Sequence, residues 1–185
     1  MFQLTRAGSI ARRYFVTNGF DGVLTLFGLL VGFRLSGTTE FGVMIQACLG
    51  AAVALGVSGL SSAYISEAAE RRKELKALEQ AMLHDLSASE YGQAVRLVPL
   101  LIACVNGLSP FLLSLLILVP LGLAQRGVPL PWPPLESAIA LALAVMFLLG
   151  VFLGKISGTH WLGMGLKAIF LGLVTAGLIL LIERW

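Results

Sequence analysis

Charged residues are scarce in this chain. Asp, Glu, Lys and Arg together make up 12% of the 185 residues, whereas an ordinary soluble domain carries about 25%. Hydrophobic residues make up 57%, and the mean hydropathy is +0.90. Because a deficit of this size leaves most of the surface without groups that water solvates, the composition excludes a soluble domain and predicts an integral membrane protein.

Cysteine and histidine are also few, with two of each. Cys48 and Cys104 both fall inside apolar runs, and neither has a CxxC neighbour, so the sequence excludes a disulfide framework or a zinc site. We interpret both as small packing residues. The chain has no phosphate-binding loop, no Ser/His/Asp arrangement and no paired metal-ligand histidines. No enzymatic activity and no cofactor are therefore expected.

Long apolar runs are abundant instead. The hydrocarbon core of a bilayer is about 30 Å thick, which a helix of about 20 apolar residues spans. Unpaired backbone groups in hydrocarbon cost several kcal/mol each, so such runs must be helices. The sequence predicts an all-α membrane protein that forms one membrane domain over residues 1–185. Its five spans are Tyr14–Leu35, Phe41–Ser66, Val95–Ala124, Ser137–Lys155 and Trp161–Ile182.

The distribution of Lys and Arg predicts the orientation of these spans. Cytoplasmic loops carry an excess of both residues. One side would hold nine of them: Arg6, Arg12, Arg13, Arg71, Arg72, Lys73, Lys76, Arg96 and Lys155. The other side would hold three, namely Arg34, Arg126 and Arg184, and Lys167 would lie inside the fifth span. The bias predicts a multi-pass protein with a cytoplasmic N-terminus and a C-terminus on the opposite side.

Two connections have opposite compositions. Residues 124–136 contain four prolines, which exclude a helix and predict an extended external loop. Residues 67–90 are polar, free of Gly and Pro and rich in helix formers, so they are expected to continue the second span as a cytoplasmic helix. The sequence from Ser87 to Glu90 resembles a capping box and predicts that the next helix begins there.

Asp21 is the main candidate for a functional residue. It lies about two turns into the first span, where a carboxylate costs about 2.5–3.5 kcal/mol on insertion scales. At 100° per residue, Asp21 shares a polar and glycine-rich side of the helix with Asn18, Gly22 and Thr25. This stripe is expected to line a cation path, with Asp21 as metal ligand or proton acceptor and Asn18 beside it. The alternative is a structural carboxylate that caps a neighbouring helix or pairs with Lys167.

A second group of candidates lies in residues 67–90. On a helical wheel Glu67, Glu70, Glu74 and Asp85 fall within about 60°, and Met82 lies nearby. Carboxylates suit divalent cations, and the thioether of Met82 adds a softer ligand. The alternative is a solvated helix with i,i+4 ion pairs, of which Glu67 with Arg71 is one.

Two segments resemble the vacuolar iron transporter family. Residues 18–32 (NGFDGVLTLFGLLVG) resemble the first-helix signature of that family, a DG-containing stretch followed by small residues. Residues 58–66 (SGLSSAYIS), followed by Glu70 and Arg71, resemble its second helix running into a charged cytoplasmic helix. Residues 154–158 (GKISG) and the apolar tail also fit its last two helices, so the resemblance covers nearly the whole chain.

The resemblance implies a homodimer that exports ferrous iron or manganese from the cytoplasm, coupled to protons. Asp21 matches the aspartate of the family's first helix, a ligand of the pathway. Two departures stand out: with Tyr64 and Ser66 aligned to the family's Tyr-x-Ser, its second-helix glutamate and methionine fall at Ala63 and Gly59. The family's three-helix cytoplasmic metal-binding domain is also reduced to one helix and a turn.

Three functions therefore stay open. The leading one is a dimeric transporter of divalent cations, whose partners are membrane lipid, the cation, protons and a second copy of the chain, with no nucleic acid among them. The second is a transporter-like fold that moves another substrate. The third is a membrane scaffold that does not transport and whose cytoplasmic helix binds a partner.

Overall fold

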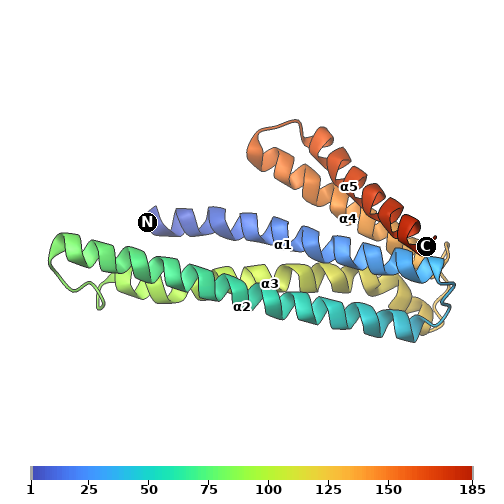
Figure 1. Ribbon diagram of the computed structural model, residues 1–185, viewed down its shortest axis with the longest axis horizontal. Helices are drawn as coiled ribbons and strands as arrows, with labels where there is room; N and C mark the ends of the chain where they lie inside the picture. Colours follow the sequence, from blue (N-terminus) through green and yellow to red (C-terminus); the bar gives the residue numbers. More distant parts are fainter. Residues whose placement is uncertain (1, 185) are drawn as a thin grey trace.

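Five α-helices make up almost the whole chain. The computed structural model describes the backbone of residues 2–184 and the side chains of residues 8–184. Arg6, which contributes to the basic bias of the sequence, has its side chain outside the described residues. In chain order the helices are α1 (Phe2–Leu35), α2 (Phe41–Met82), α3 (Glu90–Gln125), α4 (Pro134–Ser157) and α5 (Trp161–Glu183), shown in Figure 1.

All five helices are long and apolar enough to cross a membrane. Residues 2–184 form no strand, so the predicted all-helical membrane fold with five spans is confirmed. With 42 residues, α2 is about 63 Å long at 1.5 Å per residue, which is twice the thickness of the hydrocarbon core. Figure 1 shows the end of α2 and the beginning of α3 projecting together beyond the other helices.

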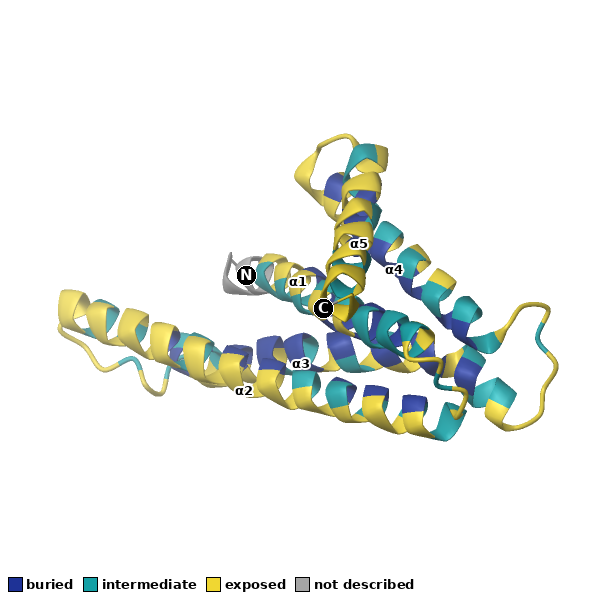
Figure 2. Ribbon diagram, turned by 45° about the vertical axis from the view of Figure 1, so that its right-hand side comes forward, coloured by how far each residue is buried: buried dark blue, intermediate teal, exposed yellow. Residues whose placement is uncertain are grey.

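The helices form two groups that meet along α1. On one side α2 and α3 lie along each other and α1 packs mainly on α3, while on the other side α4 contacts α1 and pairs with α5. Figure 2 shows buried residues concentrated on the helix faces between these neighbours, and α5 is exposed over most of its surface. The structure therefore leaves a large apolar exterior for lipid.

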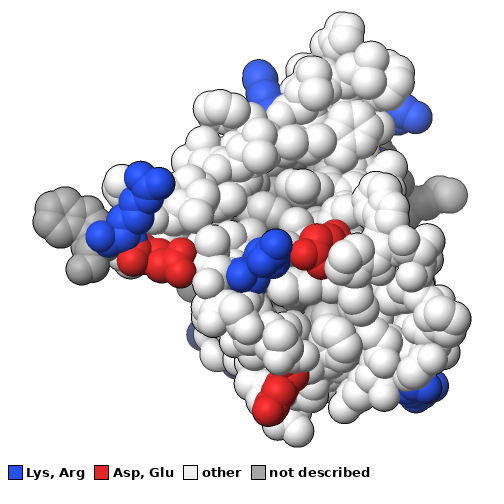
Figure 3. Space-filling model, turned by 90° about the vertical axis from the view of Figure 1, so that its right-hand side faces the viewer, with Lys and Arg blue, Asp and Glu red and all other residues white. Residues whose placement is uncertain are grey.

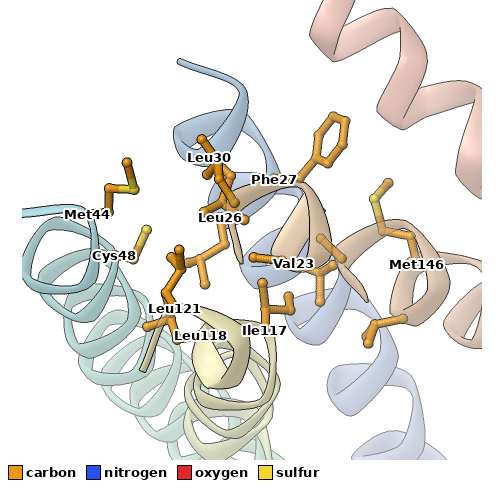
Figure 4. Close-up of a cluster of buried hydrophobic side chains, with 14 of the residues drawn as sticks. Val23, Leu26, Phe27, Leu30, Met44, Cys48, Ile117, Leu118, Leu121 and Met146 are labelled. Atoms are coloured by element: carbon orange, nitrogen blue, oxygen red, sulfur yellow. The ribbon is translucent and has the colours of Figure 1, made fainter. Parts of the chain in front are cut away.

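The apolar core lies toward the end of the bundle where α1 ends and α2 begins. Leu26 and Leu30 of α1, Met44 and Cys48 of α2 and Leu121 of α3 are almost fully buried and meet there (Figure 4). Cys48 is a packing residue, as predicted, and Cys104 is a free, half-buried thiol. Since lipid is as apolar as these side chains, dispersion contacts rather than water exclusion hold this core together.

The α2 extension covers only the first part of residues 67–90. It stops at Met82 because Leu83 adopts a left-handed conformation with φ 48°. Asp85 therefore lies in the following loop and shares no helical face with Glu67, contrary to the helical-wheel prediction.

The N-cap of α3 is Ser89, whose Oγ accepts from the backbone N–H of Gly92 at 3.2 Å. The helix begins within residues 87–90, as predicted, but its cap is Ser89, and the N–H of Ser87 is bound to Asp85 Oδ1.

The proline-rich connection is irregular, as predicted. Residues 126–133 separate α3 from α4, and Pro134 occupies the first position of α4, where its missing N–H costs no hydrogen bond. At this end of the molecule Arg34 and Glu136 form an ion pair of 3.1 Å that joins the end of α1 to the start of α4. Figure 3 shows that this end carries only scattered charged side chains on a largely uncharged surface.

Glycine allows α1 and α3 to approach very closely. A Cβ on Gly22 would lie 2.6 Å from Pro110 Cβ and 2.8 Å from Pro110 Cα, and a Cβ on Gly19 would lie 2.6 Å from Ser109 Oγ. Between α2 and α3, a Cβ on Gly107 would lie 2.6 Å from the carbonyl oxygen of Gly56. Small residues at these positions are therefore a steric requirement of the helix packing.

We predict that Gly22→Ala lowers the free energy of unfolding by about 2 kcal/mol, because the backbone of α3 would have to move away from the new methyl group. The matched control is Gly50→Ala in α2, where a Cβ would meet nothing within 4 Å and helix propensity gains up to about 1 kcal/mol. Thermal unfolding of both variants in the same detergent measures the difference. Equal melting temperatures for the two variants would contradict this packing.

Candidate functional site

A buried asparagine joins the first three helices. Asn106 of α3 is 4% exposed, and its Nδ2 donates to the backbone oxygen of Gly59 in α2 at 2.7 Å. The Nδ2 of Asn18 in α1 donates to the backbone oxygen of Asn106 at 2.7 Å. One turn away, Ser109 Oγ donates to the backbone oxygen of Phe15 at 2.6 Å. Asn106 was not among the residues predicted to be functional, although a polar side chain within an apolar span already indicates one.

Asn18 therefore has a different setting from the one predicted. Its amide is half-buried and is directed to α3, where it takes part in helix association. The predicted stripe on α1 is split along its length, with Asn18 and Gly22 against α3 on one edge and Asp21 and Thr25 exposed on the other.

Asp21 lines an intramembrane groove between α1, α4 and α5. The groove has a volume of about 270 Å³ and an apolar wall that includes Phe20, Leu149 and Leu171. Lys167 of α5 lines the same groove. Within the described part of the chain, neither Asp21 nor Lys167 has an oppositely charged group within 4.0 Å. The groove thus brings together the two ionisable residues deepest in the spans, without an ion pair in a single chain.

One face of α1 is left uncovered by the other helices. Thr17, Asp21 and Thr25 are exposed on it, and a Cβ on Gly32 would meet nothing within 4 Å. The hydroxyl of Thr25 donates to the backbone oxygen of Asp21 at 2.7 Å, so the Asp21 carboxylate is not occupied by it. A carboxylate on an uncovered face of a membrane span is costly, and a single chain does not compensate that cost.

The candidate ligands at the far end of α2 do not gather at one point. Glu67 is half-buried and paired with Arg71 at 3.6 Å, as the i,i+4 alternative predicted, while Glu70 and Glu74 are exposed. Met82 lies 15 residues beyond Glu67, which is about 22 Å of helical rise. Over residues 8–184, no group of three or more His, Cys, Asp or Glu side chains is arranged to hold a metal ion. The helical wheel grouped these residues by angle around the axis and did not take into account their separation along it.

Acidic side chains organise the loop between α2 and α3. Asp85 Oδ1 accepts from the N–H of Ser87 at 2.8 Å, and Glu79 Oε1 accepts from the N–H of Leu86 at 3.1 Å. The hydrogen bond from the Ser87 backbone stabilises the charged form of Asp85 and lowers its pKa. Asp85 therefore acts as the first residue of a local turn.

Gly59 and Ala63, the first departure from the resembled family, lie in the contact between helices. Gly59 is buried at the junction, where an added Cβ would overlap Asn18 Nδ2 and lie 3.2 Å from the backbone oxygen of Asn106. Ala63, one turn later, is 2% exposed. A methionine at position 59 would not fit between these helices.

The fold and its hydropathy define a multi-pass membrane protein. The chain is 30% identical over 181 residues to a protein of Methanocaldococcus jannaschii described as the uncharacterized protein MJ0645, and the alignment covers 96% of this chain and 91% of that protein. The chain belongs to the family of this archaeal protein. No protein-family model matches the chain, and no solved structure matches it.

We predict that Asn106→Ala lowers the free energy of unfolding by about 1–2 kcal/mol, because hydrogen bonds between membrane helices contribute about 0.6–1.7 kcal/mol and the change also leaves a small void. The matched control is Ser61→Ala, whose hydroxyl donates only within its own helix, to the backbone oxygen of Val57. This variant should remain within about 0.5 kcal/mol of the original protein. Thermal unfolding checks both, and an unchanged melting temperature for Asn106→Ala would contradict the role of this residue.

Proposed function

We propose that the protein is a transporter of divalent metal cations, ferrous iron or manganese, that works as a homodimer and exports the cation from the cytoplasm in exchange for protons. The observation that carries the proposal is the position of Asp21. This carboxylate lies within a membrane span and is exposed where the groove between α1, α4 and α5 meets the uncovered face of α1.

A second copy of the chain is the simplest cover for that face. An exposed carboxylate at membrane depth must face protein or a water-filled cavity rather than lipid. Two copies related by a two-fold axis would bring two Asp21 side chains together. Each chain alone lacks a group of three metal ligands within its described residues, and pairing would supply two carboxylates, with Thr17 and Thr25 hydroxyls beside them.

Carboxylate and hydroxyl oxygens suit Mn²⁺ and other divalent cations. A carboxylate must be deprotonated to bind a metal, so cation entry releases a proton and the two movements become linked. The preference for iron or manganese comes from the resemblance of residues 18–32 to the vacuolar iron transporters.

A transporter-like fold with another substrate is the second candidate. Lys167 lines the same groove as Asp21, and a fixed cation there favours an anionic or zwitterionic substrate over a metal. Ala63 and Gly59 stand where the resembled family has a glutamate and a methionine, and the loss of these two ligands also favours a substrate other than a metal.

The direct test is Asp21→Asn, which keeps the shape of the side chain and removes its charge. We predict that metal-dependent proton flux in liposomes falls to background while the melting temperature stays the same or rises, because an amide costs less than a carboxylate in a span. The matched control is Glu40→Gln, an exposed carboxylate at the start of α2, which should retain flux. A stable Asp21→Asn protein with unchanged metal flux would refute the proposal.

The dimer is tested by disulfide crosslinking between copies. In a background with Cys48→Ala and Cys104→Ala, we predict that Thr25→Cys forms crosslinked dimers in the membrane under mild oxidation, because α1 would face its copy. Leu173→Cys, an exposed position of α5, serves as the matched control and should not crosslink. Efficient crosslinking only at Leu173, or at neither position in a monodisperse monomer, would count against an α1 interface.

The orientation is tested by labelling with an impermeant thiol reagent. In the same background, we predict that Leu130→Cys in the proline-rich loop reacts in intact cells and that Ala77→Cys in the α2 extension reacts only after permeabilisation, because the basic residues gather on the side of Ala77. Reaction of both positions from the same side would show that the assigned orientation is incorrect.

A further inference from the structure

A second groove lies where the spans of α2 and α3 end, at the base of the segment formed by the α2 extension, the loop that follows it and the first turns of α3. We name residues 67–96 the α2–α3 hairpin (Figure 1). The groove has a volume of about 560 Å³, within the usual range of ligand pockets. It is lined by Tyr64, Ala68, Arg72 and Leu75 of α2, Ser87 of the loop, and Gly92, Val95 and Arg96 of α3.

Two arginines converge on this groove from different helices. Arg72 and Arg96 are both exposed, and neither forms an ion pair or hydrogen bond with a described side chain. No Asp or Glu is part of the groove lining. Since guanidinium groups bind phosphate oxygens through paired hydrogen bonds, the lining provides two guanidinium groups for a phosphate and no carboxylate for a cation.

The acidic residues of the hairpin lie elsewhere or are already engaged. The neighbouring groove, which shares Arg72 and continues to Lys73 and Lys76, includes Glu79 and Asp85 at its loop end. Both of these carboxylates accept hydrogen bonds from backbone N–H groups of the loop. Glu67 is paired with Arg71. The base of the hairpin is therefore basic on this side although the hairpin as a whole carries both signs.

The apolar runs of α2 and α3 end beside this groove, which puts it near the lipid headgroups when these helices span a bilayer. The apolar part of α2 ends near Ser66, two residues after Tyr64, and Arg96 comes at the start of the apolar run of α3. Arg72 is eight residues beyond Tyr64, about 12 Å along the helix, and its long side chain can extend back toward the membrane surface. The headgroup layer is about 5–8 Å thick on each side of the core. A phosphate at that depth would lie between the two guanidinium groups.

We propose that this groove binds the headgroup of an anionic phospholipid, with the phosphate between Arg72 and Arg96. The apolar side chains of Ala68 and Val95, on the membrane side of Arg72, then receive the glycerol and upper acyl carbons, and the Tyr64 ring lies at the interface. A zwitterionic headgroup binds less well, because its quaternary ammonium meets two arginines and no carboxylate. The site links the hairpin to the lipid on its own side of the membrane.

The test is the binding of defined lipids to the purified, delipidated full chain. We expect phosphatidylglycerol to raise the melting temperature by about 5 °C and to remain bound in native mass spectrometry, and phosphatidylcholine to do neither. The charge-removing pair Arg72→Gln and Arg96→Gln should weaken phosphatidylglycerol binding at least about tenfold. The matched control is Arg126→Gln, an exposed arginine at the opposite end of α3, which should bind the lipid normally.

Three outcomes overturn the proposal. Equal stabilisation by phosphatidylcholine would mean that the headgroup charge is not recognised. Equal stabilisation by inorganic phosphate or glycerol 3-phosphate would assign the groove to a soluble phosphate compound instead of a lipid. Undiminished lipid binding by the double glutamine variant would place the lipid elsewhere. If that variant does not fold, Arg72→Lys with Arg96→Lys replaces it: retained charge without the paired geometry should weaken binding several-fold, and unchanged binding would refute the proposed contact.

Discussion

Close contact between backbones at Asn106 is the constraint on which the rest of this structure depends. In hydrocarbon, apolar side chains gain little by leaving lipid for protein, so helices associate where small residues let dispersion forces and hydrogen bonds act at short range. Gly19 and Gly22 of α1 lie against Ser109 and Pro110 of α3. Gly56 and Gly59 of α2 lie against Gly107 and Asn106 in the same stretch of α3. The two asparagine amides then bond across the three helices.

This junction fixes the rotation of α1 and thereby the position of Asp21. With Asn18 and Gly22 held against α3, a residue three positions after Asn18 must point about 60° away from it. That direction leads to the uncovered face and to the edge of the groove that also holds Lys167. The same pairing of α2 with α3 continues beyond the membrane, where it brings Arg72 and Arg96 to one groove. The proposed cation site and the proposed lipid site thus depend on one packing arrangement.

The helices, the proline-rich loop and the long α2 extension could be predicted from the sequence, because hydropathy and proline act locally. The candidate site could be predicted only in part. Asp21 stands out as a lone acid in an apolar run, but its proximity to Lys167 depends on how α5 packs, which no local pattern encodes. The prediction that Asp85 shares a helical face with Glu67 was wrong because α2 ends at Met82, before Leu83, which adopts a left-handed conformation. Such a helix end is usually marked by a glycine, and this one is not. The next helix begins within residues 87–90, as the capping-box pattern predicts, but the cap is Ser89, while the N–H of Ser87 is bound to Asp85 in the loop.

If a second copy completes the uncovered face of α1, the dimer should hold a divalent cation there. Equilibrium binding of Mn²⁺ to the purified protein, followed by electron paramagnetic resonance, measures this. We expect about one tightly bound ion per two chains, because a site on a two-fold axis is shared, and its loss at low pH as carboxylates become protonated. No bound Mn²⁺, or one ion per chain in a monomer, would refute a shared cation site.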